Sequence, residues 1–269
     1  MSARLRDMAR TAVEIAERQA YRTARGTDVR IDVSSAVAGT RLYEPDQDLP
    51  ADDLRVGRRP RGAAPVIEVT GESTLAAARR LGGDVAALVF ASARNPGGGF
   101  RNGAQAQEES IARSSALYPC LLAAGDFYAG HRSHSDLAYS DRVIYSPRVP
   151  VFRDDHGELL DDPYEVSFLT AAAPNRGALP AEEVPRVPEI LRRRARRVLA
   201  VAAAHGHRRL VLGAWGCGVF RNDPTEVARA FADALRTTPV ERVVFAVLGP
   251  NRPEFTAVLA DSASADSAR

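Results

Sequence analysis

The stretch PVIEVTGESTLAAARRLGGDVAALVFAS, residues 65–92, decides the fold class of this 269-residue chain. PVIEV (65–69) has the composition of a strand, and STLAAARRL (73–81) predicts a helix that Ser73 opens. VAALVFAS (85–92) is a continuous apolar run, as expected of a strand that is buried on both faces. A strand, a helix and a buried strand in this order are typical of an α/β fold.

The same alternation continues to the end of the chain. Further strands are predicted at 29–33, 142–147, 166–173, 209–215 and 241–249, and further helices at 3–21, about 109–125, 182–205, 223–235 and 253–260. In the helix at 223–235, Asp223 can cap the first turn and Glu226 completes a capping-box pattern. We therefore expect an α/β fold with a mixed, mainly parallel sheet and helices on both of its faces.

Composition excludes several classes of function. The net charge of +2 gives no overall field for a membrane surface or for indiscriminate nucleic-acid binding. All 36 basic residues are arginine, so a phosphate-binding lysine and Schiff-base chemistry are both excluded. Cys120 and Cys217 are too few and too far apart for a disulfide framework or a zinc site. No segment has the length and composition of a signal peptide or a membrane span, so we expect a cytoplasmic protein.

Two glycine-rich segments directly follow predicted strands: NPGGGFRNGAQAQEES (95–110) and GAWGCGVF (213–220). Because ligands of such sheets bind outside the carboxyl ends of the strands, both segments are expected at one edge. Gly213, Gly216 and Gly218 let backbone N–H groups converge, which suits a phosphate or diphosphate. A glycine-rich turn with a packing role is the alternative. The spacing differs from GxGxxG, which argues against a nicotinamide-dependent oxidoreductase.

Glu108 and Glu109 are neighbours at a predicted helix start, so their side chains diverge by roughly 100°. They therefore cannot easily flank one glycosidic bond as acid and nucleophile. We expect one carboxylate to orient substrate hydroxyls and the other to transfer a proton. The helix N-terminus lowers the pKa of such a group, whereas burial, the acidic neighbour and a bound diphosphate raise it. The alternative is that QEES is an ordinary first turn of a helix.

Gly97-Gly98-Gly99, followed after seven residues by Gln107-Glu108-Glu109, resembles the signature of poly(ADP-ribose) glycohydrolases of the compact bacterial type. The resemblance covers about residues 65–260, with GAWGCGVFRNDP as a second matching segment. It implies a macrodomain, a three-layer α/β/α fold, with an N-terminal helical extension. The expected domains are an extension at 1–60 packed on the core, a catalytic domain at 61–262 and a disordered tail at 263–269.

The resemblance also implies roles for individual residues. Glu109 matches the catalytic acid, which protonates the leaving ribose 2′-oxygen and then, as carboxylate, activates water. Glu108, the second catalytic residue, and Gln107 match residues that hold the ribose hydroxyls. The other implied substrate-binding residues are Glu72, Asn95, Gly97, Gly98, Gly99, Gly216, Cys217, Gly218, Val219 and Phe220. Cys217 would contribute backbone rather than thiol chemistry, Phe220 would pack near the catalytic ribose, and Glu72 stands where many macrodomains have an adenine-contacting aspartate.

The implied function is hydrolysis of ribose–ribose O-glycosidic bonds in poly(ADP-ribose), mainly from chain ends, with no cofactor and no metal. The expected partners are poly(ADP-ribose), ADP-ribose and the ADP-ribosylated proteins that carry the polymer, without DNA or membrane binding, and the protein is expected to be a monomer. One alternative is a macrodomain that binds ADP-ribose without turnover, which needs no poised acid. Another is a hydrolase that removes ADP-ribose from other acceptors.

Two charged segments are expected to lie outside the site. HRSHSD (131–136) is predicted to be a solvent-exposed polar loop rather than a metal site. RRRARR (192–197) is predicted to be the solvated face of a helix whose other side is apolar. A long polyanionic substrate touching this arginine run is the alternative.

Overall fold

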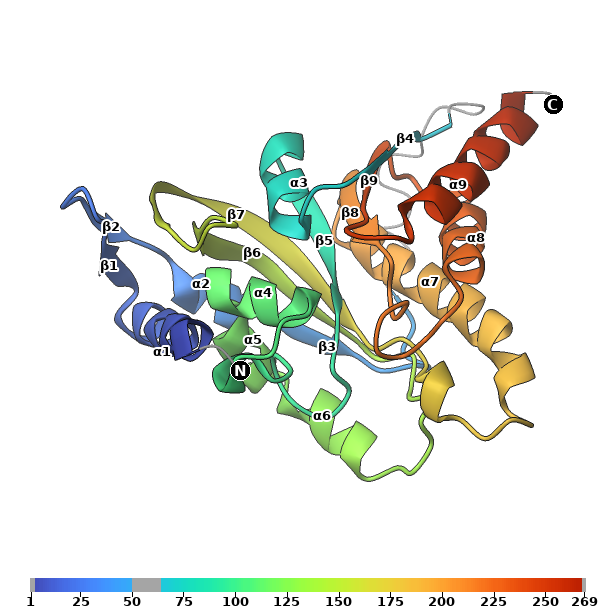
Figure 1. Ribbon diagram of the computed structural model, residues 1–269, viewed down its shortest axis with the longest axis horizontal. Helices are drawn as coiled ribbons and strands as arrows, with labels where there is room; N and C mark the ends of the chain where they lie inside the picture. Colours follow the sequence, from blue (N-terminus) through green and yellow to red (C-terminus); the bar gives the residue numbers. More distant parts are fainter. Residues whose placement is uncertain (1–2, 50–63, 268–269) are drawn as a thin grey trace.

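A seven-stranded mixed sheet runs through the computed structural model, which describes residues 3–49 and 64–267 (Figure 1). The strand order is β3-β6-β7-β5-β8-β9-β4. The bounds are β3 Arg41–Tyr43, β4 Val66–Thr70, β5 Val85–Phe90, β6 Val143–Arg153, β7 Leu159–Ala171, β8 Arg209–Gly213 and β9 Arg242–Ala246. Strands β7, β5, β8, β9 and β4 pair in parallel, whereas β6 runs antiparallel to both of its neighbours. The predicted mixed, mainly parallel sheet is confirmed.

Helices cover both faces of this sheet. They are α1 Ala3–Arg18, α2 Val33–Gly39, α3 Thr74–Leu81, α4 Gln107–Ser114, α5 Leu117–Ala123, α6 Gly125–Arg132, α7 Val187–Ala204, α8 Pro224–Leu235 and α9 Arg252–Ser267. On β5, Ala87 and Val89 pack into the core beneath α1–α6, while Ala86 and Leu88 pack into the core beneath α7–α9. Because β5 is covered by helices on both faces, neither face meets solvent, and this explains its unbroken run of apolar residues.

The helix caps follow the sequence signals. The Ser73 hydroxyl accepts the Ala76 N–H at 3.0 Å, and Asp223 Oδ1 accepts the N–H groups of Thr225 and Glu226 at 2.8 and 3.1 Å. The predicted capping box of α8 is wrong in one part. Glu226 forms an ion pair with Arg176 at 3.1 Å, so its carboxylate is engaged by the segment before α7.

The single helix predicted at 109–125 is divided into α4 and α5. Ser115 has extended backbone angles (φ −142°, ψ 170°) and forms a β-bridge with Val151. The Arg153 guanidinium donates to the Arg113 carbonyl at 2.6 Å, which satisfies an orphan carbonyl near the end of α4. The helix therefore ends where its backbone pairs and hydrogen-bonds with β6. The periodicity of the sequence cannot predict a contact between two distant segments.

The N-terminal segment contributes to the central sheet as well as covering it. After α1, the short strands β1 (Ala20–Arg22) and β2 (Asp28–Arg30) form an antiparallel pair, and α2 leads into β3. β3 pairs with β6 through Arg41 and Tyr145, so it forms one edge of the seven-stranded sheet. Most of the predicted linker at 44–64 lies outside the described residues.

The C-terminal helix α9 extends into the segment 263–269, for which the sequence predicts disorder, and residues 268–269 lie outside the described part of the chain. Across residues 3–49 and 64–267, none of the helices combines the length and the apolar character needed to cross a lipid bilayer.

Candidate active site

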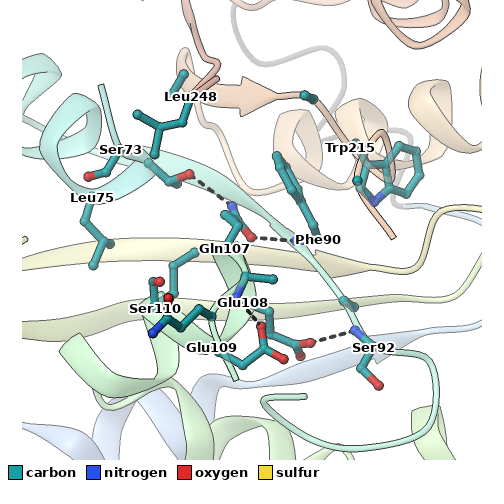
Figure 2. A pocket seen from close by; sticks show the side chains of 18 of the residues that line it. Ser73, Leu75, Phe90, Ser92, Gln107, Glu108, Glu109, Ser110, Trp215 and Leu248 are labelled. Atoms are coloured by element: carbon teal, nitrogen blue, oxygen red, sulfur yellow. Dashed lines mark hydrogen bonds between the residues drawn. The ribbon is translucent and has the colours of Figure 1, made fainter. Parts of the chain in front are cut away.

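A cavity of about 1040 Å³ opens at the carboxyl ends of β4, β5, β8 and β9. The segments that follow β5 and β8 both line it, so the prediction that the two glycine-rich segments share one edge is confirmed (Figure 2). Nine of the predicted site residues line the cavity: Glu72, Asn95, Gln107, Glu108, Glu109, Gly216, Gly218, Val219 and Phe220. Within the described chain, Gly97, Gly98, Gly99 and Cys217 are not among its lining residues.

Both carboxylate oxygens of Glu109 accept backbone N–H groups. Oε1 accepts from Gly99 at 2.9 Å, and Oε2 accepts from Ala106, the N-cap residue of α4, at 3.0 Å. Glu109 is the third residue of the helix, and from this position a glutamate can reach back to the N-cap amide. The side chain is 9% exposed, so the structure fixes this carboxylate in one orientation at the cavity wall.

Glu108 is more deeply buried, at 2% exposure, and only one of its oxygens is satisfied. Oε2 accepts the Ser92 N–H at 2.6 Å, whereas Oε1 is buried without a hydrogen-bond partner among the described residues. Burial, together with the neighbouring Glu109 charge, raises the pKa of Glu108 well above its usual value, against the opposing effects of the Ser92 and Gly97 N–H groups. The raised pKa favours the neutral form of this carboxyl.

The raised pKa of Glu108 predicts a pH-dependent stability difference between the wild type and Glu108→Gln. Because the folded pKa lies above the ordinary 4.5, the folded state binds more protons, and stability falls as pH rises between the two values. Glutamine lacks this titration. Urea unfolding from pH 4 to 8 should show the variant gaining stability over the wild type as pH rises. Parallel stability curves for the two proteins would refute a raised pKa at this position.

The glycine triplet supports the two carboxylates. Gly97 and Gly98 have positive φ, +69° and +59°. A Cβ on Gly98 would overlap Glu109 Oε1, and it would lie 2.9 Å from Glu109 Cδ and 3.0 Å from Glu108 Oε2. Gly99 supplies the N–H that binds Glu109. The backbone of the triplet thus passes directly behind the acids.

Gln107 connects the start of α4 to the rest of the fold. Its Oε1 accepts the Phe90 N–H at 2.9 Å, and its Nε2 donates to the Leu88 carbonyl at 2.7 Å and to Thr74 Oγ1 at 3.1 Å. The neighbours define the orientation of this amide, because one is a backbone donor and one a backbone acceptor. The protein itself engages both ends of the amide and thereby positions the next two residues, Glu108 and Glu109.

The loop after β8 approaches the cavity with exposed backbone and apolar side chains. Gly216 has a φ of +72°, and a Cβ there would lie 2.6 Å from Ala173 Cβ and would overlap Asn222 Nδ2. Asn222, which sequence reasoning missed, is buried and donates to the carbonyls of Pro174 and Gly216 at 2.9 and 3.3 Å. Val219 is 85% exposed at the cavity, as expected of a side chain that a ligand covers.

Phe220 lines the cavity and contacts a second aromatic ring. Its centroid lies 5.9 Å from that of Tyr139, which also lines the cavity and was not predicted. Tyr139 has a φ of +61°, a conformation that its sequence context does not signal. Phe90, the last residue of β5, and Trp215, which follows β8, also line the cavity. Their apolar sequence context predicted only that they are buried in the core.

Glu72 and Cys217 have environments that restrict their chemistry. The Glu72 carboxylate accepts three hydrogen bonds from Arg80, at 2.9, 3.2 and 2.8 Å, and this contact lowers its pKa. Its carboxylate is thus engaged by the protein, although Glu72 lines the cavity. Burial raises the pKa of the Cys217 thiol to about 12, which leaves little thiolate at neutral pH.

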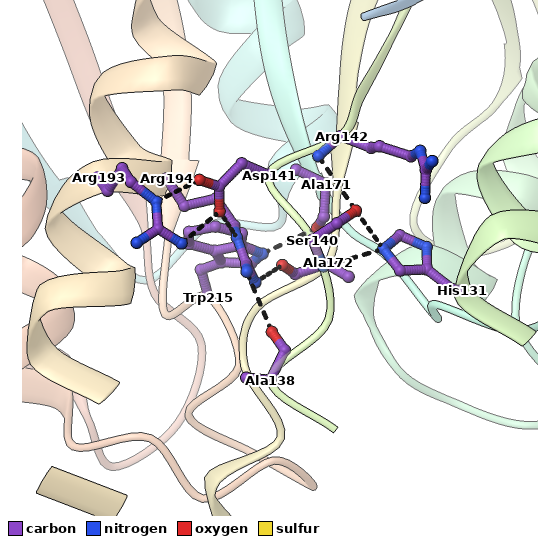
Figure 3. A network of polar contacts seen from close by, with 10 residues as sticks. All are labelled: His131, Ala138, Ser140, Asp141, Arg142, Ala171, Ala172, Arg193, Arg194 and Trp215. Atoms are coloured by element: carbon purple, nitrogen blue, oxygen red, sulfur yellow. Dashed lines mark hydrogen bonds and ion pairs between the residues drawn. The ribbon is translucent and has the colours of Figure 1, made fainter. Parts of the chain in front are cut away.

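Behind the cavity, a buried arginine corrects one of the sequence predictions (Figure 3). Arg194, predicted to lie on a solvated helix face, is fully buried. It donates to the carbonyls of Ala172 and Ala138 at 2.7 and 3.0 Å and pairs with Asp141 at 2.9 Å, an acid that also pairs with Arg193. This network ties α7 to the segment that carries Tyr139.

The histidine segment also differs from expectation. His131 is buried, not exposed, and its Nε2 lies 2.7 Å from Ser140 Oγ. Burial lowers the pKa of this histidine to about 4, so the ring is neutral at physiological pH. In the described part of the chain, no group of three or more His, Cys, Asp or Glu side chains is placed to hold a metal ion.

Comparisons with known proteins relate this geometry to a family. The family model for the catalytic domain of microbial-type PARG matches residues 9–154. The solved structure of poly(ADP-ribose) glycohydrolase from Thermomonospora curvata is similar to this chain at 50% identity and a TM-score of 0.88, over 97% of this chain and 100% of that one. Bound to the inhibitor ADP-HPD, the enzyme from this organism gives 51% identity, a TM-score of 0.86 and the same coverage.

A second relative comes from Deinococcus radiodurans. Its poly(ADP-ribose) glycohydrolase, solved in complex with ADP-ribose, is 47% identical with a TM-score of 0.80, over 87% of this chain and 99% of that one. A search of curated proteins finds no match. The similarity to solved structures therefore spans nearly the whole chain, including both segments that line the cavity.

Proposed function

The chain belongs to the microbial-type poly(ADP-ribose) glycohydrolase family, and from this premise we propose that it hydrolyses the ribose–ribose bonds of poly(ADP-ribose). It acts mainly from chain ends and releases ADP-ribose. The observation that carries the proposal is the pair of adjacent carboxylates, Glu108 and Glu109, held at the cavity wall by backbone N–H groups of Ser92, Gly99 and Ala106. A protein that only binds ADP-ribose has no need for two buried acids at this point.

ADP-ribose occupies the cavity in this proposal. The solved relatives that bind ADP-ribose and the inhibitor ADP-HPD support this placement. The diphosphate lies against the backbone of 216–218, where glycines leave N–H groups accessible. Val219 and Phe220 cover the ribose, and the adenine lies toward Glu72, with Asn95 near the catalytic ribose. To accept a hydrogen bond from the adenine amino group, the Glu72 carboxylate must either share its oxygens with Arg80 or release Arg80.

The two glutamates divide the chemistry between them. Glu109 protonates the leaving 2′-oxygen as the C1″–O2′ bond breaks, and as carboxylate it then takes a proton from the water that adds to C1″. Glu108 holds the ribose hydroxyls, and Gln107 fixes the helix start on which both glutamates depend. The reaction needs neither a metal nor another cofactor.

The architecture proposed is a three-layer macrodomain at residues 61–262 with an N-terminal extension at 1–60. The tail predicted to be disordered at 263–269 is instead helical as far as Ser267, where α9 ends. The distribution of α1–α6 and α7–α9 over opposite faces supports the layers. The protein acts as a cytoplasmic monomer on the free polymer and on ADP-ribosylated proteins that carry it, without direct contact to DNA.

The test is release of free ADP-ribose from purified poly(ADP-ribose), with and without a metal chelator, alongside direct titration of ADP-ribose binding. Rapid release that the chelator does not slow is the expected result. Tight ADP-ribose binding without release would identify a non-catalytic binding domain instead. Release from mono-ADP-ribosylated proteins but not from the polymer would move the activity to other acceptors.

A further inference from the structure

The cavity continues beyond the two carboxylates. In Figure 2, Phe90, Ser92 and Trp215 lie on one side of the row formed by Gln107, Glu108 and Glu109, and Ser73, Leu75 and Ser110 lie on the other. Contacts connect further lining residues to this far side: Asp155 of the β6–β7 hairpin accepts the Ser73 hydroxyl, and Arg113 of α4 lies 3.5 Å from Ser110 Oγ. Leu5 and Met8 of α1 and Asp154 of the same hairpin also line the cavity. We call this part of the cavity the acceptor groove.

The whole cavity is large. At about 1040 Å³ it lies at the upper end of the roughly 300–1,000 Å³ range of small-molecule pockets. The loop after β8 and the segment after β5 account for one side of the carboxylates, where the diphosphate and the catalytic ribose of the terminal ADP-ribose lie in the proposed function. The acceptor groove lies on the side to which a leaving group must depart.

The groove has an apolar lining with polar groups at both ends. Leu5, Met8 and Leu75 supply the apolar surface. Near Glu109, Arg113 is buried and donates to the Ala104 carbonyl at 2.6 Å, and it forms no ion pair within the described residues. At the other end, Asp155 Oδ1 accepts the Ser73 hydroxyl at 2.8 Å.

This distribution of charge suits a nucleoside better than a diphosphate. Asp154 and Asp155 repel a phosphate at the far end of the groove. An aromatic base fits the apolar side chains, and its amino group can donate to the aspartates. The adjoining ribose then lies close to Glu109, with Arg113 near the point where the chain carries its negative charge.

We propose that the acceptor groove binds the adenosine of the leaving ADP-ribose unit, the nucleoside whose 2′-oxygen Glu109 protonates. This inference rests on the proposed function and extends it to substrate recognition on the leaving side. The enzyme then contacts the units on both sides of the bond that it cleaves. A polymer bond is consequently cleaved more efficiently than the bond to a small leaving group of equal reactivity.

The test compares two substrates in Leu5→Asp, which adds a negative charge to the apolar side of the groove. The substrates are poly(ADP-ribose) and ADP-ribose carrying p-nitrophenol at C1″, in which a single ring replaces the adenosine. The ratio of kcat/KM for the polymer to kcat/KM for the small substrate is expected to fall about tenfold or more. Leu122→Asp, at an exposed apolar side chain of α5 outside the cavity, is the matched control and should keep the wild-type ratio.

Asp155→Asn provides a second variant, because this exposed position tolerates an isosteric change if Leu5→Asp fails to fold. It should lower the same ratio in the same direction, since it removes a charged acceptor for the base. An unchanged ratio in a folded Leu5→Asp or Asp155→Asn protein would overturn the acceptor groove. If the wild type cleaves neither substrate, the proposed function itself is wrong, which is a separate outcome.

Discussion

Glu109→Gln is expected to lower kcat for ADP-ribose release from the polymer by about 10²–10⁴-fold, the usual contribution of general acid–base catalysis. The glutamine can neither protonate the leaving oxygen nor activate water. ADP-ribose affinity should stay within a few-fold of wild type, because Glu109 stands at the wall of a cavity that other segments build. Free ADP-ribose appearing over time, and titration calorimetry with ADP-ribose, are the measurements.

The acid–base assignment has a clear competitor in Glu108. Glu108 is the carboxyl whose pKa is raised by burial, while both oxygens of Glu109 accept backbone N–H groups. Glu108→Gln should therefore be compared directly, with Glu165→Gln, an exposed β7 position, as the control for loss of a carboxylate. If Glu108→Gln loses kcat and Glu109→Gln keeps it, the roles of the two acids must be exchanged. We expect Glu108→Gln to act mainly on KM.

Gly98→Ala is expected to reduce kcat by about 10²-fold or more while leaving a folded protein. The added methyl would occupy the space of the Glu109 carboxylate and press on Glu108 Oε2. Misplacement of a catalytic group by about 1 Å costs on the order of 10²-fold in rate. The positive φ adds about 1–3 kcal/mol of backbone strain to the folded state. Steady-state kinetics and urea unfolding measure the two effects separately.

Gly206→Ala is the matched control for Gly98→Ala. Gly206 has a φ of +78° after the end of α7, and a Cβ there would meet no atom within 4 Å. Gly206→Ala should lose a similar amount of unfolding free energy and keep the wild-type kcat. Equal losses of kcat in the two variants would mean that general destabilisation, rather than displacement of the carboxylates, explains the Gly98 result.

Local signals in the sequence predicted those parts of the fold whose cause is local. The hydroxyl of Ser73 and the carboxylate of Asp223 cap their helices because each accepts a backbone N–H group from the first turn that follows it. The continuous apolar composition of β5 likewise predicted that this strand is buried. The break after Ser114 was not predicted, because its cause is the pairing of Ser115 with Val151 on another element.

The same limit applies to the site. Glu108 and Glu109 were found because the glycine triplet and the two glutamates lie in one short segment of the sequence, at a fixed spacing that can be recognised. Asn222 and Tyr139 were missed, since each acts through contacts made only in the folded chain, at Gly216 and Phe220. Arg194 was predicted on the wrong side of its helix because its partner, Asp141, lies far away in the sequence. The glycine triplet was expected to face the ligand, whereas the structure places it behind the carboxylates.

The edge strand β3 has a consequence for any shortened form of this protein. β3 lies on the N-terminal side of the 44–64 segment and pairs with Val143, Ile144 and Tyr145 of β6. A fragment that begins after this segment would leave the backbone N–H and C=O groups at that end of β6 without their partners. Unpaired strand edges template pairing with other chains. Aggregation in such a fragment would then arise from the open edge of β6. The fragment would also lack Leu5 and Met8 from the cavity wall, while both glutamates of α4 and the loop after β8 would still be present.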